Sequence, residues 1–417
     1  MQTLGGWHTD ILIGWRNLWR NPKRTLLACL AIAIAQTTLI WINSFMNGYE
    51  VSIFETLTGP VLGHIQIHAP KYRDDEAIER VITNVSLLER QILNEPHVRS
   101  VSSRVYSPVL VSLKETGHVA RLTGLNVSQE KMVGGILQGL RADEVLVGQE
   151  ILVGKGLAAD MGLQPGDTLA LMGQAVDGSV ASGLYRIKAV IETSVDQINQ
   201  SGVIMDLQAA RDFLVMGDQV HELVIRADSQ QVVPAVLSSL KSLPDLKPYE
   251  IMSWDELVPS LAELLKVASK SNYLILVLVF LTTIAGVANT MLMATFERIR
   301  EFGMLLALGC RPKRIIRMLI IESFTLGIVG VGIGTVLGVA LTLHGLLHGI
   351  DLATLGGAKH DLNLSFEGMS LNSTVFLVLK LKDILNGVGA VCVTSILASI
   401  LPARRIGRIE PVEAMRS

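Results

Sequence analysis

The chain has 417 residues, of which 49% are hydrophobic and only 18% are charged, and its formal net charge at pH 7 is -2. This composition is more apolar than that of an ordinary soluble enzyme, and the near-neutral charge excludes the strong basic field expected of a nucleic-acid-binding protein. The three cysteines, Cys29, Cys310 and Cys392, lie in or beside apolar stretches. The polar middle of the chain has none, which excludes a disulfide scaffold.

The N-terminal residues 1–25 are basic and amphipathic. In residues 10–20 apolar side chains recur at helical spacing, while Arg16 and Arg20 occupy the other face. This pattern predicts a helix on the membrane surface; a plain basic juxtamembrane segment is the alternative. Residues 26–48 follow as a first membrane span, because their apolar run reaches the length of about 20 residues that a bilayer requires. No small-x-small cleavage site follows it, so we expect a permanent anchor.

The polar middle of the chain, residues 49–270, alternates short β-branched runs with turn signals. Runs such as "GHIQIHA", "RVYSPVLVSL" and "YRIKAVIET" predict strands, whereas "VVPAVLSSLKSL" and residues 154–161 predict helices. The pattern is typical of an α+β domain. Its last part, "WDELVPSLAELLKVASKSNYLILVLVF", predicts one continuous helix that leads into the next apolar stretch.

Three further apolar stretches lie in residues 271–417. They cover about residues 273–296, 318–343 and 384–401, which brings the prediction to four transmembrane helices beside the α+β domain. Positive charges are concentrated before the first span, between the second and third spans, and after the fourth. By the positive-inside rule, both termini and the turn between the second and third spans are expected in the cytoplasm, and residues 49–270 outside.

Two pairs of histidines are candidate metal ligands. His64 and His68 alternate with isoleucines in a predicted strand and therefore share one face. A metal site would need a third ligand, which the sequence does not place, so we expect an exposed strand face. His344 and His348 lie one helical turn apart, but "HGLLH" lacks the glutamate of the metalloprotease motif. We therefore expect no catalytic or metal site.

Glycines form a stripe in the third span. Gly330, Gly334 and Gly338 are spaced four residues apart, and such spacing lets another helix backbone approach closely in a membrane. The partner is either a span of the same chain or a span of a second subunit. The glycine-rich string lacks the Gly-Lys-Ser/Thr of a phosphate-binding loop, and the sequence contains no Walker motif, so any ATP hydrolysis is expected in a partner.

The turn between the second and third spans carries a family resemblance. The segment "ANTMLMATFERIREFGMLLALGCRPKRIIRMLIIES" closely resembles the C-terminal module of FtsX-like permeases, the membrane subunits of MacB- and LolE-type ABC transporters. The start "WRNLWRNPKRT", the middle "GKGLAADMGLQPGDTLAL" and the tail "LPARRIGRIEPVEAMRS" resemble other parts of the family. In the tail, Ile406 and Glu410 depart from the usual pattern. The resemblance covers nearly the whole chain.

The resemblance implies a bacterial inner-membrane protein with four spans and a large periplasmic MacB-like α+β domain. It implies two permease subunits, identical or different, and two separate cytoplasmic ATPase subunits that bind ATP and Mg, with no cofactor in this chain. Residues of about 297–312 are then the coupling helix, whose charges would orient the ATPase and whose apolar and small residues would contact it. The residues expected there are Glu297, Arg298, Arg300, Glu301, Phe302, Gly303, Ala307, Gly309 and Arg311.

The resemblance also implies the kind of work done. ATP-driven motion would pass through the spans to the outside domain and would extract or export lipoproteins, lipids or other hydrophobic envelope substrates. Possible further partners are a periplasmic adaptor, a lipoprotein carrier and membrane lipid, but not nucleic acid. Two alternatives stay open: a non-transporting regulator of a cell-wall hydrolase, and an efflux permease that works with a periplasmic adaptor.

Overall fold

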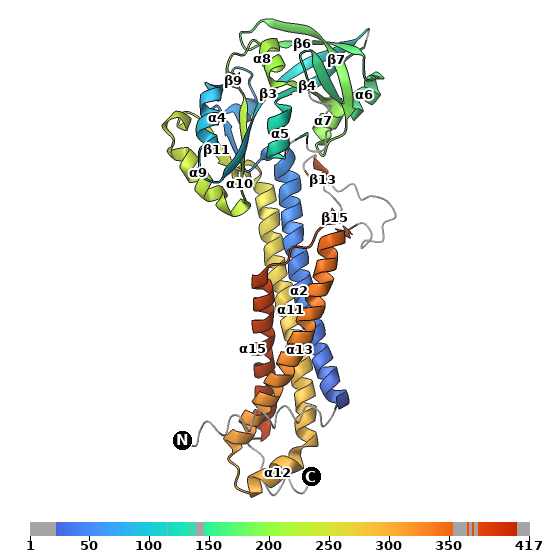
Figure 1. Ribbon diagram of the computed structural model, residues 1–417, viewed down its shortest axis with the longest axis vertical. Helices are drawn as coiled ribbons and strands as arrows, with labels where there is room; N and C mark the ends of the chain where they lie inside the picture. The colour runs from blue at the N-terminus through green and yellow to red at the C-terminus, as the bar shows by residue number, and fades with distance from the viewer. Residues whose placement is uncertain are drawn as a thin grey trace. The chain divides into compact units, whose positions relative to one another are not determined.

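The computed structural model describes residues 22–114, 116–134, 136–137, 146–352, 365–366, 369–370 and 374–406. The chain forms two compact units (Figure 1). The helical unit contains Met1–Val51, Leu264–Gly356 and Thr374–Ser417, and the α+β unit contains Ser52–Glu263 and Gly357–Ser373. The predicted surface helix at residues 10–20 and the C-terminal tail from residue 407 onward lie outside the described residues.

Long apolar helices make up the helical unit. Four helices among the described residues are long and apolar enough to cross a membrane, and the stretches that qualify are Thr25–Thr56, Pro259–Gly286, Pro312–His348 and Leu381–Ile400. The helices themselves are α2 (Pro22–Leu57), α11 (Pro259–Glu297), α13 (Pro312–His348) and α15 (Leu381–Ile406), with the short α12 (Ile299–Ala307) between α11 and α13. The boundary between the two units falls within α2 and within α11.

The interior of the helical unit is apolar with a few buried polar side chains. Ile32 and Leu39 of α2, Leu326 of α13 and Val391 of α15 belong to one buried cluster, and Figure 1 shows α13 and α15 side by side. Gln36 is fully buried, and its Nε2 lies 3.4 Å from Thr335 Oγ1. Beyond the end of α13, the strands β12 (Ile350–Asp351) and β15 (Thr374–Val375) pair antiparallel.

A nine-stranded mixed sheet forms the α+β unit. Its strand order is β11-β1-β10-β3-β4-β8-β5-β7-β6, and β6 also pairs with β3. Most pairs are antiparallel, but β4–β8 and β5–β7 are parallel. The strands are β1 (Ile65–His68), β3 (Val98–Leu113), β4 (Thr116–Leu125), β5 (Glu150–Gly154), β6 (Thr168–Gln174), β7 (Val180–Ile191), β8 (Gly202–Asp206), β10 (Glu222–Ala227) and β11 (Glu250–Ser253).

Short helices cover this sheet. They are α3 (Tyr72–Asp75), α4 (Val85–Leu93), α5 (Val127–Val133), α6 (Lys155–Met161), α7 (Asp196–Ser201), α8 (Leu207–Phe213), α9 (Val233–Ser242) and α10 (Trp254–Leu257). Smaller elements are the π-helical η1 (Thr58–Leu62), the 3-10 turns η3 (Gln230–Val232) and η4 (Pro244–Leu246), and the two-residue strands β2 (Ile82–Thr83), β9 (Gln219–Val220), β13 (Ser365–Phe366) and β14 (Met369–Ser370).

The long strand β3 joins the two parts of the sheet. Its first residues pair with β10, where Ser102 lies opposite Val224, and its last residues pair with β6, where Val111 lies opposite Leu171. β4 pairs with β3 from Arg104 to Leu113. Side chains placed where β3, β4 and β10 meet therefore come from sequence positions far apart.

The predicted α+β architecture is confirmed for this unit, but one predicted helix is interrupted. The segment that starts at Trp254 forms α10, and α11 begins separately at Pro259. Between them, Val258 has φ -132° and ψ 80°. A proline disfavours the α conformation in the residue before it and lacks an N–H to continue a helix. Pro259 therefore starts α11 and separates it from α10. The predicted helix is wrong before Pro259, but from Pro259 it continues without a break into the second apolar stretch, as predicted.

Candidate functional site

The turn between α11 and α13 is built as a separate helix. Arg298 leaves the α conformation with φ -105° and ψ 14°, which ends α11 and precedes α12. Gly309 has φ +84°, a left-handed conformation that glycine adopts without strain, and it follows the end of α12. Pro312 then occupies the first turn of α13, where its missing N–H costs nothing. The sequence thus encodes both ends of a short helix.

Arg298 connects the start of α12 to the middle of α13. Its Nε donates to Glu301 Oε2 at 3.0 Å, and its Nη1 donates to Glu322 Oε2 at 2.9 Å. The guanidinium also lies over the ring of Phe302, 5.1 Å from the ring centroid. The side chain of Glu322 is only 7% exposed, so this contact lies at the edge of the protein interior. A hydrogen bond of this length between two ionised groups is stronger than a hydrogen bond between neutral groups.

Phe302 packs within the chain. It is 3% exposed and forms a buried cluster with Ile315 and Leu319 of α13, against which Leu305 and Leu306 also pack. We expected Phe302 on a face that contacts an ATPase. The structure places it instead on the inner face of α12, because residues three and four apart in a helix share a face and Phe302, Leu305 and Leu306 follow that spacing.

The outer face of α12 is apolar where a solvent-exposed turn would normally be polar. Met304 is 54% exposed and Leu308 is 85% exposed. Small and charged side chains surround them. The other residues predicted for this site are the buried Gly303, the half-buried Glu301 and the exposed Glu297, Arg300, Ala307, Gly309 and Arg311.

The glycine stripe of α13 faces α2 of the same chain. A Cβ atom built on Gly330 would lie 2.7 Å from the Ile32 side chain, and one built on Gly334 would lie 2.5 Å from the Ala33 carbonyl oxygen. At Gly338 the corresponding distance to Ile40 is 3.1 Å. Gly332, on the other side of the helix, would meet no atom within 4 Å. The close approach of α2 therefore requires the stripe.

A second candidate site lies in the α+β unit, where buried charges surround a cavity. Arg104 and Glu130 are completely buried and form a two-bond ion pair, with Nε–Oε1 at 2.7 Å and Nη2–Oε2 at 3.0 Å. Ser102 Oγ donates to the same Glu130 carboxylate at 2.7 Å. The pair joins strand β3 to helix α5. Its geometry satisfies the main demand of a buried charge, which is a closely bonded partner.

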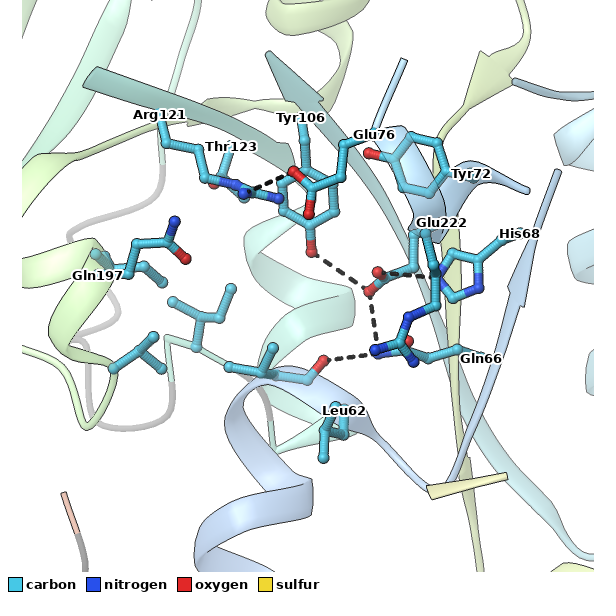
Figure 2. A pocket seen from close by; sticks show the side chains of 15 residues that line it. Leu62, Gln66, His68, Tyr72, Glu76, Tyr106, Arg121, Thr123, Gln197 and Glu222 are labelled. Carbon is cyan, nitrogen blue, oxygen red and sulfur yellow. Dashed lines mark hydrogen bonds and ion pairs between the residues drawn. The ribbon is translucent and has the colours of Figure 1, made fainter. Parts of the chain in front are cut away.

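Glu222 is the second buried carboxylate of this cluster, and it is held less closely. Its side chain is 9% exposed. Its Oε1 accepts from Tyr106 Oη at 3.3 Å and from Gln66 Nε2 and Arg104 Nη1 at 3.4 Å. His68 Nε2 lies 3.3 Å from Oε2, and it is the donor, since a carboxylate only accepts. Figure 2 shows the contacts of Glu222 with Tyr106, Gln66 and His68.

A cavity of about 260 Å3 adjoins Glu222. Figure 2 shows Tyr106, Arg121, Glu76 and Glu222 among its polar lining. At its rim, Arg121 forms an ion pair with Glu76 at 2.9 Å and lies over the Tyr106 ring, 4.8 Å from the centroid. The lining residues are Val61, Leu62, Gln66, His68, Tyr72, Arg73, Glu76, Tyr106, Arg121, Thr123, Ile136, Val195, Gln197, Ile198 and Glu222.

The surroundings of the cavity set the charge of its ionisable groups. Burial raises the pKa of Glu222, but the hydrogen bond from His68 and the charge of Arg104 outweigh this, and the net effect lowers the pKa. The carboxylate is therefore ionised at neutral pH. Burial and the charge of Glu222 raise the pKa of Tyr106, which keeps its hydroxyl protonated. Burial also lowers the pKa of His221.

The expected exposed face for His64 and His68 is wrong, because both side chains are buried. Their relative exposures are 2% and 1%. His64 Nδ1 accepts a bond from the Ala227 backbone N–H at 3.1 Å, and burial together with the charge of Arg226 lowers the pKa of His64 to about 4. Strand β1 lies between β10 and β11, so it is covered on both edges. No group of three or more metal-ligating side chains occurs among the described residues.

Sequence reasoning missed the cluster around Arg104 and Glu222. The one signal was a charged residue at the edge of each predicted strand run, "RVYSPVLVSL" and "ELVIRA". That signal does not distinguish a buried charge from the solvent face of a strand. Pairing of β3 with β10, which sets Arg104 opposite Glu222, was needed to show that the two charges meet.

Comparison with known sequences assigns both parts of the chain. The sequence model of the MacB-like periplasmic core domain matches residues 25–243, and that of the FtsX-like permease C-terminal region matches residues 273–411. The lipoprotein-releasing system transmembrane protein LolE of Haemophilus influenzae is 24% identical, with 98% of this chain and 100% of the relative covered.

Two other relatives carry two different functional names. The lipoprotein-releasing system transmembrane protein LolC of Neisseria meningitidis is 22% identical, with 94% of each chain covered. The macrolide export ATP-binding/permease protein MacB 2 of Aeromonas hydrophila is 24% identical over 95% of this chain but only 58% of the relative. These identities establish common ancestry and leave the transported substance open.

Proposed function

Because the chain belongs to the family of permeases with a MacB-like periplasmic core domain and an FtsX-like C-terminal region, we propose that it is the membrane subunit of an ABC transporter. ATP hydrolysis takes place in a separate ATPase subunit that binds ATP and Mg, in keeping with the lack of a Walker motif in the 417 residues. The chain lies in the bacterial inner membrane with four spans, both termini in the cytoplasm and the α+β unit in the periplasm. Two permease subunits form one complex.

The observation that carries the proposal is the outer face of α12. Leu308, at 85% exposure, and Met304, at 54%, protrude from a turn that is otherwise rich in charge. An exposed apolar patch with charged neighbours is typical of a protein contact. Arg300 and Arg311 border the patch and would orient an acidic or mixed-charge partner. In this proposal α12 is the coupling helix that binds the ATPase.

The inner face of α12 supports transmission of force. Phe302 packs against Ile315 and Leu319, and Arg298 bonds to Glu322. A displacement of α12 by the ATPase would therefore move α13 as well, because a packed contact with a charge-assisted bond resists sliding. In this proposal the turn has two roles. The predicted residues Arg300 and Arg311 bind the partner together with Met304 and Leu308, and the predicted residues Arg298 and Phe302 pass on the motion together with Glu322.

The proposed work is extraction or export of a lipoprotein, a lipid or another hydrophobic envelope substrate. The relatives that are covered over nearly their full length are named for lipoprotein release, and this supports lipoprotein as the first substrate to test. A lipoprotein carrier or a periplasmic adaptor would then be the partner on the other side of the membrane. The second candidate is efflux, because the MacB relative is named for macrolide export and its alignment spans 95% of this chain.

Replacement of Leu308 by glutamate tests the docking role. We expect association of the chain with its co-expressed ATPase to fall at least about tenfold, because a buried apolar contact would be replaced by a desolvated charge. The measurement is the amount of ATPase that co-purifies with the tagged full chain from detergent-solubilised membranes. Val119→Glu is a matched control, because Val119 is 74% exposed on β4 of the other unit. Undiminished co-purification with Leu308→Glu would refute docking at α12.

A further inference from the structure

The cavity beside Glu222 has the features of a built binding site. Its inner lining contains buried polar side chains, whereas Arg73, Glu76 and Gln197 at the rim are exposed. The volume of about 260 Å3 is at the small end of the range of ligand pockets, which begins near about 300 Å3. A small molecule rather than a long acyl chain fits this space.

Glu222 lacks a closely bonded cation of its own among the described residues. Arg104 is engaged by Glu130 through bonds of 2.7 and 3.0 Å, and these two charges cancel. Glu222 adds a second negative charge, and its ion-pair contacts among the described residues are Arg104 at 3.4 Å and His68 at 3.3 Å. The Nδ1 atom of His68 is buried without a hydrogen-bond partner among the described residues. Glu222 thus shares with Glu130 a cation that lies closer to Glu130.

The bonds to Glu222 are also longer than those to Glu130. All four contacts of the Glu222 carboxylate lie between 3.3 and 3.4 Å, whereas typical bonds to a carboxylate are about 2.7 to 2.9 Å long. The carboxylate therefore retains acceptor capacity. A cationic group in the cavity would give this carboxylate a closer partner.

The cavity also has apolar lining residues. They are Val61, Leu62, Ile136, Val195 and Ile198, and Leu62, Ile136, Val195 and Ile198 are each less than a tenth exposed. Figure 2 shows Leu62 on the side of the cavity away from Arg121 and Tyr106. A ligand that matches this lining has a positive charge at one end and a compact apolar body at the other.

We propose that the cavity binds a small amphiphilic amine, whose ammonium group pairs with Glu222 and whose apolar body packs against Leu62, Ile136 and Ile198. Thr123 and Tyr106 border the ammonium position, and the exposed rim at Gln197 and Glu76 provides the entrance. The site is independent of the docking of an ATPase at α12, and it assigns a ligand chemistry to the α+β unit.

The test uses three probes of the same shape and different charge: cyclohexylamine, cyclohexanol and cyclohexanecarboxylate. Binding of each to the purified full chain in a non-ionic detergent is measured at pH 7 by titration calorimetry, with empty micelles as the blank. We expect the amine to bind at least about tenfold more tightly than the alcohol, and the carboxylate to bind most weakly. Equal affinity of amine and alcohol, or the tightest binding by the carboxylate, would overturn the proposal.

Two variants locate the binding. Glu222→Gln removes the charge and keeps the size, and it should reduce the amine affinity at least about tenfold while leaving the alcohol unaffected. Thr123→Leu enlarges a lining side chain without removing an ion pair, and it should weaken both probes. Glu192→Gln is the control, because Glu192 forms an exposed pair with Lys155 outside the cavity.

Folding of each variant is checked by its thermal unfolding temperature. If Glu222→Gln does not fold, the charge preference of the unaltered chain and the effect of Thr123→Leu decide the outcome. Amine binding that survives both Glu222→Gln and Thr123→Leu would place the amine elsewhere and refute the proposal.

Discussion

Each unit of the molecule contains an arginine that joins distant segments through glutamate, and the two differ in burial. Arg104 and Glu130 in the α+β unit are both 0% exposed, and two bonds connect them. Arg298 and Glu322 in the helical unit are 16% and 7% exposed, and one bond of 2.9 Å connects them. The first pair lies inside a sheet-based core, and the second lies at the end of a helix bundle.

Because the two ion pairs differ in burial, they are expected to differ in the stability that is lost when one partner is removed. Loss of one partner of a buried pair leaves a charge without water or counter-ion, which is costly, whereas water can replace a partner at a more exposed site. The α+β unit is therefore expected to behave as one rigid body around Arg104. The turn at Arg298 is expected to open locally at a lower cost in free energy than the α+β unit.

The largest effect is expected from Arg104→Met. The change leaves Glu130 buried without its cation and should reduce the free energy of unfolding by about 3–5 kcal/mol. Urea unfolding of the full chain in detergent, followed by circular dichroism, measures it. The double variant Arg104→Met/Glu130→Leu should regain part of the loss, because it removes both charges. A loss below about 1 kcal/mol for the single variant would show that the buried pair is not the central connection.

A smaller effect is expected from Gly334→Ala in α13. The added Cβ would lie 2.5 Å from the Ala33 carbonyl oxygen, so α2 must move away, at a cost of about 1–3 kcal/mol. A lower thermal unfolding temperature in detergent is the readout. Gly332→Ala on the same helix meets no atom within 4 Å and is the matched control. Equal unfolding temperatures for the two variants would contradict close packing of α13 on α2 and would favour the reading in which the stripe contacts another subunit.

The smallest effect on stability is expected from Arg298→Gln. The pair is partly exposed, so its loss should cost about 1 kcal/mol, and the loss should be confined to α12. Amide hydrogen exchange in α12 should become roughly fivefold faster. A loss of about 1.4 kcal/mol would speed exchange about tenfold, and the loss expected here is about 1 kcal/mol. Lys313→Gln, at an exposed position in the first turn of α13, should leave the exchange rate of α12 nearly unchanged. Unchanged exchange with Arg298→Gln would mean that Phe302 alone holds α12.

Much of the fold could be predicted from the sequence because its signals are local. Runs of apolar residues predicted helices, and alternation with turn signals predicted the α+β unit. Gly309 and Pro312 also encode the end of α12 and the start of α13 through their own backbone preferences, although we predicted Gly309 only as a contact residue. The interruption before α11 also has a local cause at Pro259, but the apolar periodicity on both sides concealed it.

The sites were predicted less well, because they depend on which faces meet. The sequence predicted the segment that contains α12 and left Phe302 on the docking face, whereas the packing of α12 on α13 places Phe302 inside and leaves Leu308 outside. For His64 and His68 the sequence predicted the exposure wrongly, because alternation does not reveal whether a strand lies at an edge or in the middle of a sheet.

The sequence by itself thus determined the family, the long apolar helices and the α+β character, since each of these depends on composition and on neighbours within a few residues. Only the tertiary structure decided that the glycine stripe faces α2, that Phe302 is an internal contact, and that Glu222 lies beside a cavity. Arg104 and Glu222 are 118 residues apart, and a contact over that distance arises from strand pairing between β3 and β10. Strand pairing depends on the whole sheet, which no local pattern describes.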